Sequence, residues 1–201
     1  MKDQNTAQKI LKAAEEEFFE KGFGGARMLS IAARAGVSHS MLHYYFRSKE
    51  ELFKQVFDSK AKLISAILEG IYSEDVDFLD LIRQFSERQF DVMKDNDRFG
   101  MFVVSNVVND QENLRKAIEL CTGRFSAYLK SFTHSLEEEI KAGRIRRISA
   151  ANLILDVVSL NMMTFLSLPV MRKIMSKDEL ERYLSERKTS NADLIVAGLR
   201  P

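Results

Sequence analysis

The sequence predicts an all-α protein of about nine helices, with a small N-terminal head followed by a larger helical body. Three observations lead to this prediction. Apolar residues recur every three or four positions through most of the chain, as they do on one face of a helix. Serine or asparagine stands in a capping position before several of these segments. Only 2 prolines interrupt the 201 residues, so long helices can form without breaks.

Composition narrows the class of protein. The chain is 45% hydrophobic and 29% charged, and it has no tryptophan, which is typical of a helical protein that works in water. The net charge is only +1, so any binding of nucleic acid must depend on a local patch. The one cysteine, Cys121, excludes an internal disulfide framework and fits a reducing compartment. The first residues lack the apolar core of a secretory signal, and we expect a cytoplasmic protein.

The helices are expected in order along the chain, and polar or glycine residues separate them. Gly22 ends the first helix, Gly36 the second, and Ser48 with Glu51 forms a capping box for the fourth. The apolar run at 150–171 is interrupted by polar residues, so it is expected to be a buried helix and not a membrane span. The predicted helices are 5–21, 30–35, 38–45, 48–69, 75–94, 98–108, 109–143, 149–168 and 176–199.

The segment from Met28 to Phe53 carries the strongest functional signal. An alanine-rich helix over residues 30–35 is followed by Gly36 and then by Ser38, which can cap a second short helix. Two helices joined by so tight a turn form the helix-turn-helix that enters the major groove of DNA. No Asp or Glu occurs between Lys21 and Lys49, where about four would be expected from an even distribution. The absence of acids favours contact with a polyanion.

These residues resemble the N-terminal signature of TetR-type transcriptional regulators. The resemblance covers roughly the first 55 residues and rests on Gly22-Phe23, Ala35 to Ser38, Tyr44 to Phe46 and Lys49 to Phe53. It implies a DNA-binding head at 1–47 and a ligand-binding and dimerisation body at 48–201. The chain departs from the family pattern in two places: Arg27 replaces the usual Thr or Ser, and His43 replaces the usual Tyr. Arg27 cannot cap the second helix as Thr or Ser would.

Candidate DNA contacts follow from the helix-turn-helix and the resemblance. The segment from Ser38 to Tyr45 is expected in the major groove, with His39, Ser40, Met41 and His43 nearest the base edges. Those expected at phosphates are Arg27, Tyr44, Arg47 and Lys49. The expected partner is double-stranded DNA with a near-palindromic operator, because a homodimer presents two heads.

The body is rich in phenylalanine and methionine, which suits either a plain core or an apolar ligand cavity. The resemblance favours a cavity for a small, largely apolar effector, and the candidate lining residues are Phe78, Phe85, Phe102, Asn106, Phe125, Phe132, Asn161, Met162 and Phe165. The helix at 149–168 is apolar nearly all round and needs a second cover. The family dimerises through its last two helices, and the candidate interface residues are Leu155, Val158, Met163, Leu184, Leu194 and Ile195.

Other functions are less well supported. No motif for a nucleotide-binding loop, a metalloprotease or a serine hydrolase occurs, and we expect neither an enzyme nor a cofactor. Asp75, Asp77 and Asp80 stand at the start of a predicted helix, where acids ordinarily complement its dipole, so we expect no metal site. The sequence therefore predicts a ligand-responsive regulator, most simply a repressor. A transcriptional activator and a helical protein-interaction module are the alternatives.

Overall fold

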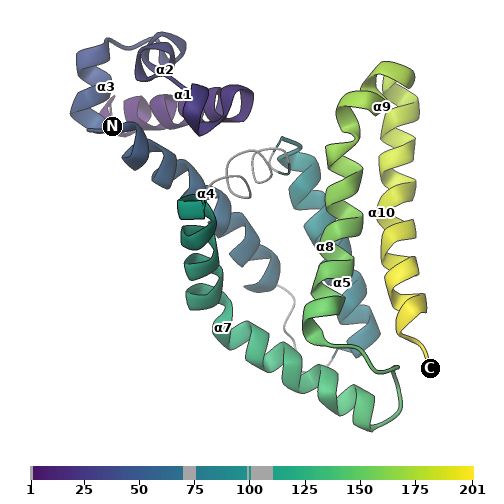
Figure 1. Cartoon of the computed structure of the whole chain (residues 1–201). Helices are drawn as coiled ribbons and strands as arrows, with labels where there is room; N and C mark the ends of the chain where they lie inside the picture. Colours follow the sequence, from purple (N-terminus) through teal and green to yellow (C-terminus); the bar gives the residue numbers. More distant parts are fainter. Residues whose placement is uncertain (1, 70–75, 99, 101–110) are drawn as a thin grey trace. The chain divides into compact units, whose positions relative to one another are not determined.

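The computed structural model describes residues 2–69, 76–98, 100 and 111–201, without the side chains of 2–4, 60–69, 112–114 and 116–125. Within these residues there are nine α-helices and no strand, which confirms the all-α prediction (Figure 1). The helices are α1 (Lys2–Gly25), α2 (Met28–Ala35), α3 (His39–Tyr45), α4 (Lys49–Glu69), α5 (Phe78–Asp95), α7 (Gln111–Lys141), α8 (Ala150–Leu166), α9 (Leu168–Ile174) and α10 (Lys177–Leu199). The helix predicted at 98–108 lies largely outside the described residues.

The chain divides into two compact units. The first comprises Met1–Leu63 and Met101–Ala117, and the second comprises Ile64–Gly100 and Ile118–Pro201. Two of the three boundaries, after Leu63 and after Ala117, fall within the long helices α4 and α7. The start of α4 packs into the head, because the Phe53 ring meets the Phe18 ring edge-on with centroids 5.1 Å apart. The core of the head therefore extends beyond residue 47.

The head is built on α1 and its kink. Ile10, Ala14 and Phe18 are fully buried along one face of α1, as their spacing predicts. Gly22 leaves the helical conformation with φ 67° and ψ 172°, which only glycine adopts readily. The turn brings Phe23 back onto the head core, where its ring centroid lies 5.0 Å from that of Phe53.

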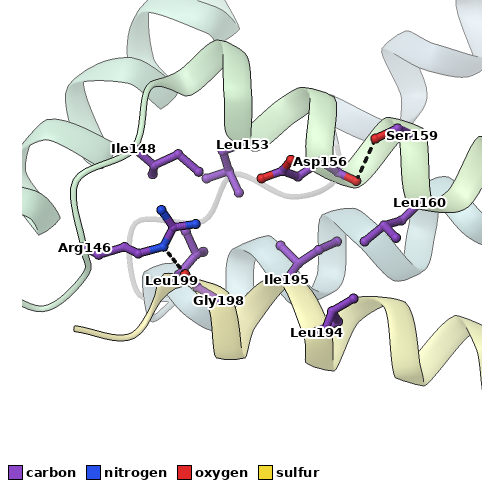
Figure 2. Close-up of a pocket in the computed structure, with 10 residues that line it drawn as sticks. All are labelled: Arg146, Ile148, Leu153, Asp156, Ser159, Leu160, Leu194, Ile195, Gly198 and Leu199. Atoms are coloured by element: carbon purple, nitrogen blue, oxygen red, sulfur yellow. Dashed lines mark hydrogen bonds between the residues drawn. The ribbon is translucent and has the colours of Figure 1, made fainter.

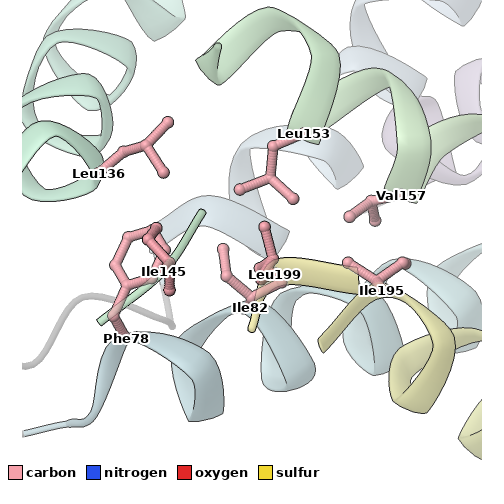
Figure 3. Close-up of a cluster of buried hydrophobic side chains, with 8 residues drawn as sticks. All are labelled: Phe78, Ile82, Leu136, Ile145, Leu153, Val157, Ile195 and Leu199. Carbon is pink, nitrogen blue, oxygen red and sulfur yellow. The ribbon is translucent and has the colours of Figure 1, made fainter. Parts of the chain in front are cut away.

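The second unit has two hydrophobic clusters that share three helices. Figure 3 shows the first cluster, where side chains of α5, α7, α8, α10 and the segment before α8 converge; it comprises Phe78, Ile82, Leu136, Ile145, Leu153, Val157, Ile195 and Leu199. The second cluster comprises Phe90, Met93, Phe165, Leu168 and Leu184. Both clusters draw on α5, α8 and α10, so these three helices form most of the core of the second unit.

A polar layer separates the two clusters. Asn161 of α8 is completely buried, and its amide donates to the Ser86 carbonyl at 2.9 Å and to Gln89 Oε1 at 2.7 Å. The Asn191 amide of α10 donates in turn to Asn161 Oδ1 at 2.9 Å. Three buried atoms of this region, Ser86 Oγ, Asn191 Oδ1 and Arg187 Nε, have no hydrogen-bond partner among the described residues. Because a buried polar group without a hydrogen-bond partner is costly, the layer fixes the register of α5, α8 and α10 relative to one another.

Several predicted helix ends are confirmed and others shift. Ser149 caps α8 and Ser176 forms the predicted capping box with Glu179. Helix α5 begins later than predicted because Asp77 caps it, accepting from the N–H groups of Leu79 and Asp80. The helix predicted at 149–168 is α8, and a short separate helix, α9, follows it after a bend of 44°. In the described part of the chain no single helix passes as a membrane span, although this bent pair does so by length and composition.

Candidate nucleic-acid interface

The turn between α2 and α3 takes the tight form that the sequence predicts. Gly36 adopts φ 67° and ψ 32°, in the left-handed region. Its N–H and that of Val37 donate to the carbonyls of Ala33 and Ala32 and so close the end of α2. Ser38 Oγ then accepts from the Met41 N–H at 3.1 Å, which starts α3. The helix-turn-helix geometry follows from these two caps.

Helix α3 has one buried and one exposed face. Leu42 and the following Phe46 are buried at 0% and 3% exposure and anchor the helix to the head. The candidate base-reading residues lie on the open side, where all are exposed: His39, Ser40, Met41 and His43. Ser38, at the start of the helix, is exposed as well. Tyr44 is also exposed, at 81%. The structure thus brings these predicted residues together on one face, which leaves them available to a groove of DNA.

The candidate phosphate-binding cations differ in what they contact. Arg27 is exposed at the N-cap of α2 and makes no side-chain cap, as expected for arginine at this position. Arg47 is exposed, and its backbone N–H donates to the Glu51 carboxylate at 3.0 Å. Lys49 is different. Its ammonium donates to the carbonyls of Phe23 at 2.8 Å and Ala26 at 3.3 Å, and lies 4.5 Å from the Phe23 ring centroid. It therefore ties α4 to the α1–α2 turn, and its contact with phosphate stays a prediction.

The start of α4 is capped in a slightly different way from the prediction. Ser48 Oγ accepts from the Glu51 N–H at 3.1 Å, which is one half of a capping box. The Glu51 carboxylate accepts from the N–H of Arg47, one residue earlier than a capping box requires.

Acidic residues of α1 neutralise part of the charge that the sequence assigns to the head. The Arg34 guanidinium of α2 pairs with Glu20 at 2.7 Å and with Glu16 and Glu17 at 3.3 Å each. Lys21 pairs with Glu17 at 2.7 Å. The count of acids between Lys21 and Lys49 could not reveal these pairs, because the glutamates precede that window. The Arg34 side chain therefore joins α2 to α1 within the head.

Glu17 is the buried centre of this network, with no exposed surface. Burial raises its pKa, but hydrogen bonds from Lys21 and Ser30 and the charges of Lys21 and Arg34 lower it more, so the pKa lies below the ordinary 4.5. The carboxylates of Glu20 and Glu16 hold the pKa of Arg34 above its ordinary value. Both shifts favour the charged forms, so the network joins α1 to α2 at neutral pH.

The candidate pocket residues are divided between the two core clusters of the second unit. Phe78 is buried in the first cluster, and Phe85 and Phe132 pack against it. Phe165 is buried in the second, where Met162 packs, and Asn161 belongs to the polar layer between them. Phe102, Asn106 and the side chain of Phe125 lie outside the described residues. The ligand site therefore stays a prediction.

The candidate interface residues differ in exposure. Leu155 and Met163 of α8 and Leu194 of α10 are exposed at 62%, 64% and 59%. Val158 is half-buried, whereas Leu184 and Ile195 are buried within the chain's own core. Beside Leu194 lies an open hollow of about 340 Å³ between α8 and α10. In Figure 2, Arg146 and Ile148 border it at one end, Arg146 donates to the Gly198 carbonyl, and Asp156 lies across from α10.

Comparison with known proteins matches the head to a family of regulatory proteins. Residues 10–56 match the model of the family described as "Bacterial regulatory proteins, tetR family". The chain is 28% identical to the HTH-type transcriptional regulator RutR of Escherichia coli K12, over 72% of this chain and 66% of RutR. It is 34% identical to the uncharacterized HTH-type transcriptional regulator YdgC of Bacillus subtilis, over 48% of this chain and 53% of YdgC. The match thus spans about half to two thirds of these relatives.

Solved structures extend the likeness of fold to the whole chain. The transcriptional regulator FadR of Bacillus subtilis, in complex with stearoyl-CoA, has a TM-score of 0.69 at 20% identity, covering 96% of this chain and 99% of FadR. A Clostridium perfringens protein named as a fatty acid metabolism regulator has a TM-score of 0.72 at 22% identity, covering 96% and 99%.

Proposed function

Because the chain belongs to the TetR family of bacterial regulatory proteins, we propose that it is a sequence-specific DNA-binding repressor released from its operator by a small, largely apolar molecule. The observation that carries this proposal is α3. It is fixed by the buried Leu42 and Phe46 and capped by Ser38, while its opposite face is open. A short helix held rigidly by one face, with polar groups on the other, suits the reading of base edges.

The groups on the open face match the chemistry of the major groove. His39, Ser40 and His43 can donate or accept hydrogen bonds at base edges, and Met41 can contact a thymine methyl group. Arg27 and Arg47 are exposed on either side of this face in the sequence and can pair with phosphates. Tyr44 can donate its hydroxyl hydrogen bond to a phosphate oxygen.

The exposed apolar residues of the body support a homodimer. Leu155 and Met163 are two turns apart on α8 and both face solvent in the single chain, as does Leu194 on α10. Large apolar side chains on adjacent helices are typical of a surface that another molecule covers, and a second copy of α8 and α10 would cover them symmetrically. Two heads held in this way match half-sites about 34–36 Å apart.

The effector is proposed to bind the body and to favour the conformation that does not bind DNA. It can release the operator only to the extent that it binds that conformation more tightly. The Phe- and Met-rich sequence of the body supports an apolar ligand. FadR of Bacillus subtilis has been solved with stearoyl-CoA, so a series of acyl-CoA thioesters is the first panel to test.

The central test is selection of bound duplexes from a random DNA library by the purified protein near physiological salt. Enrichment of one near-palindromic site supports the proposal, and the effector panel is then tested on that site. If a folded, dimeric protein enriches no sequence, both as purified and after unfolding and refolding to remove any bound ligand, the proposal is wrong. Partner binding that is insensitive to salt would instead indicate a protein-interaction module.

Arg27→Ala tests the phosphate contact. Arg27 makes no cap hydrogen bond, so its removal should leave the head folded while the affinity falls similarly for all sequences. Each dimer loses two cations, and the slope of log K against log salt should become shallower by about two. Arg147→Ala removes the same charge from an exposed site in the second unit and serves as the control.

A further inference from the structure

Two of the three histidines of the chain form a pair on the open face of α3. His39 and His43 are four residues apart, so their side chains lie one helical turn from each other on the same side. Their ring centroids are 4.5 Å apart with an interplanar angle of 85°. Both residues are exposed, and their rings can rotate without disturbing the head core. The two imidazoles therefore lie next to each other on the surface of α3.

The geometry points to a metal site that this family assignment does not include: we propose that His39 and His43 together chelate a divalent transition-metal ion of the Zn²⁺, Ni²⁺ or Cu²⁺ type, and that bound metal prevents α3 from reading DNA. Two histidines at positions i and i+4 of one helix are the spacing with which helices present imidazoles to zinc. Zinc–nitrogen bonds of about 2.0–2.1 Å place the ion between two such rings.

The surroundings select the class of metal. Imidazole nitrogen suits zinc, copper and nickel, whereas calcium and magnesium prefer carboxylate and carbonyl oxygen. No carboxylate occurs in the sequence from Lys21 to Lys49. Among the residues that the structure describes, no group of three or more His, Cys, Asp or Glu side chains is placed to hold a metal ion. The pair is therefore a two-ligand site, and water completes the coordination.

The regulatory part of this inference rests on the proposed function, because it requires α3 to bind DNA. A metal ion occupies a ring-nitrogen lone pair on each histidine, and these lone pairs are the acceptors that His39 and His43 would offer to base edges. The ion with its water ligands also adds bulk to a face that must enter the groove. Metal binding and base reading should therefore exclude each other, and operator affinity should fall as the metal concentration rises.

Metal binding is tested first on the free protein, without DNA. The probe is ZnCl₂, titrated calorimetrically into protein that carries no histidine tag and has been treated with chelator. Cys121→Ser is the background, because a thiol also binds zinc. His39→Gln and His43→Gln should each lower the zinc affinity at least about tenfold, since one imidazole is left. His134→Gln removes the one histidine outside the pair and should leave the affinity unchanged.

Ring signals of the three histidines give a second readout that does not depend on affinity. Substoichiometric Cu²⁺, which is paramagnetic, should broaden the NMR signals of His39 and His43 and leave those of His134 sharp. Zinc binding that is unchanged in both pair variants, or equal broadening of all three histidines, would overturn the metal site.

The regulatory part is tested on a duplex enriched in the selection experiment. Zinc should weaken binding of the Cys121→Ser protein to that duplex at least about tenfold, and the ratio of affinities with and without zinc should approach one in His39→Gln. An unchanged operator affinity in a protein shown to bind zinc through the pair would overturn the regulatory part alone. Failure of the selection would refute the proposed function and leave the calorimetric result standing.

Discussion

Replacing Asn161 with leucine should destabilise the second unit more than most single substitutions do. The side chain is completely buried and takes part in three hydrogen bonds, two as donor and one as acceptor. Leucine has the same number of side-chain heavy atoms with the same branching, so no cavity forms and the loss chiefly reports the polar layer. Gln89 Oε1 and the Asn191 amide then lose their partner, and the Ser86 carbonyl, which lies within α5, keeps its helical hydrogen bond but loses the second one from Asn161.

The size of the expected loss of stability depends on which hydrogen-bond partners of Asn161 are accessible to water. Ser86 and Asn191 are each 1% exposed, and a buried polar group left unpaired costs about 1–3 kcal/mol. Gln89 is only half-buried and can regain water. The unpaired Asn191 amide at about 2 kcal/mol and the second bond to the Ser86 carbonyl at about 1 kcal/mol, offset by about 1–2 kcal/mol from burying the leucine side chain, give a net decrease of about 1.5 kcal/mol in the free energy of unfolding.

Urea unfolding followed by circular dichroism measures this decrease. Asn152→Leu, at an exposed position of the same helix, is the control and should change the free energy of unfolding by less than about 0.5 kcal/mol. Asn161→Leu combined with Asn191→Leu should cost less than the sum of the single substitutions, since each single substitution leaves the other asparagine without its partner in the Asn191–Asn161 hydrogen bond and the double variant removes both groups. A loss below about 1 kcal/mol for Asn161→Leu, or strictly additive losses, would refute this account of the layer.

Three further predictions concern the head and the proposed dimer. Gly36→Ala should destabilise the head by about 1–2 kcal/mol through its positive φ; an added Cβ meets nothing within 4 Å, so no steric clash contributes. Gly24 is equally open but has no positive φ, so Gly24→Ala should not destabilise the head. Thermal melts of the two variants compare these effects. The folded-state pKa of Glu17 lies below 4.5, so the folded form binds fewer protons than the unfolded form. The stability that the charged Glu17 contributes is therefore lost as pH falls through that lowered pKa. The melting temperature of Glu17→Gln should fall less between pH 6 and pH 3 than that of the unmodified protein. Leu194→Arg should convert the proposed dimer to monomer in sedimentation experiments at micromolar concentration, whereas Arg substitution at the exposed Leu29 of the head should not.

Local signals in the sequence predict much of this fold. The turn at Gly36, the caps at Ser38, Ser149 and Ser176 and the buried face of α1 all follow from residues within one or two turns of each other. Such features depend on backbone hydrogen bonds and helical spacing, which a short segment determines. The face of α3 that carries the candidate DNA contacts was predictable for the same reason.

Features that depend on distant partners were not predictable. Asn161 is a polar residue in an apolar helix, and its partners stand 72, 75 and 30 residues away in sequence. Nothing near it in the chain indicates that it pairs with α5 and α10. The same limit applies to Lys49, whose carbonyl partners precede it by 26 and 23 residues, so its position at the start of α4 predicted a phosphate contact but not these hydrogen bonds.

The ion pairs of the head change what the sequence implies about DNA affinity. Of five cations between residues 21 and 49, Lys21 and Arg34 pair with glutamates of α1. Arg27, Arg47 and Lys49 remain as candidate phosphate contacts, which gives at most six per dimer. Each contact contributes about −0.9 to the slope of log K against log salt, so the slope should be about −5 and not the −9 that ten cations would give. A slope near −9 for the selected duplex would mean that Arg34 and Lys21 leave their glutamates when DNA binds. In that case Glu20→Gln, which removes the shortest ion pair to Arg34, should not make the slope of log K against log salt any steeper. If instead the pairs stay intact when DNA binds, Glu20→Gln should raise the affinity for DNA at low salt.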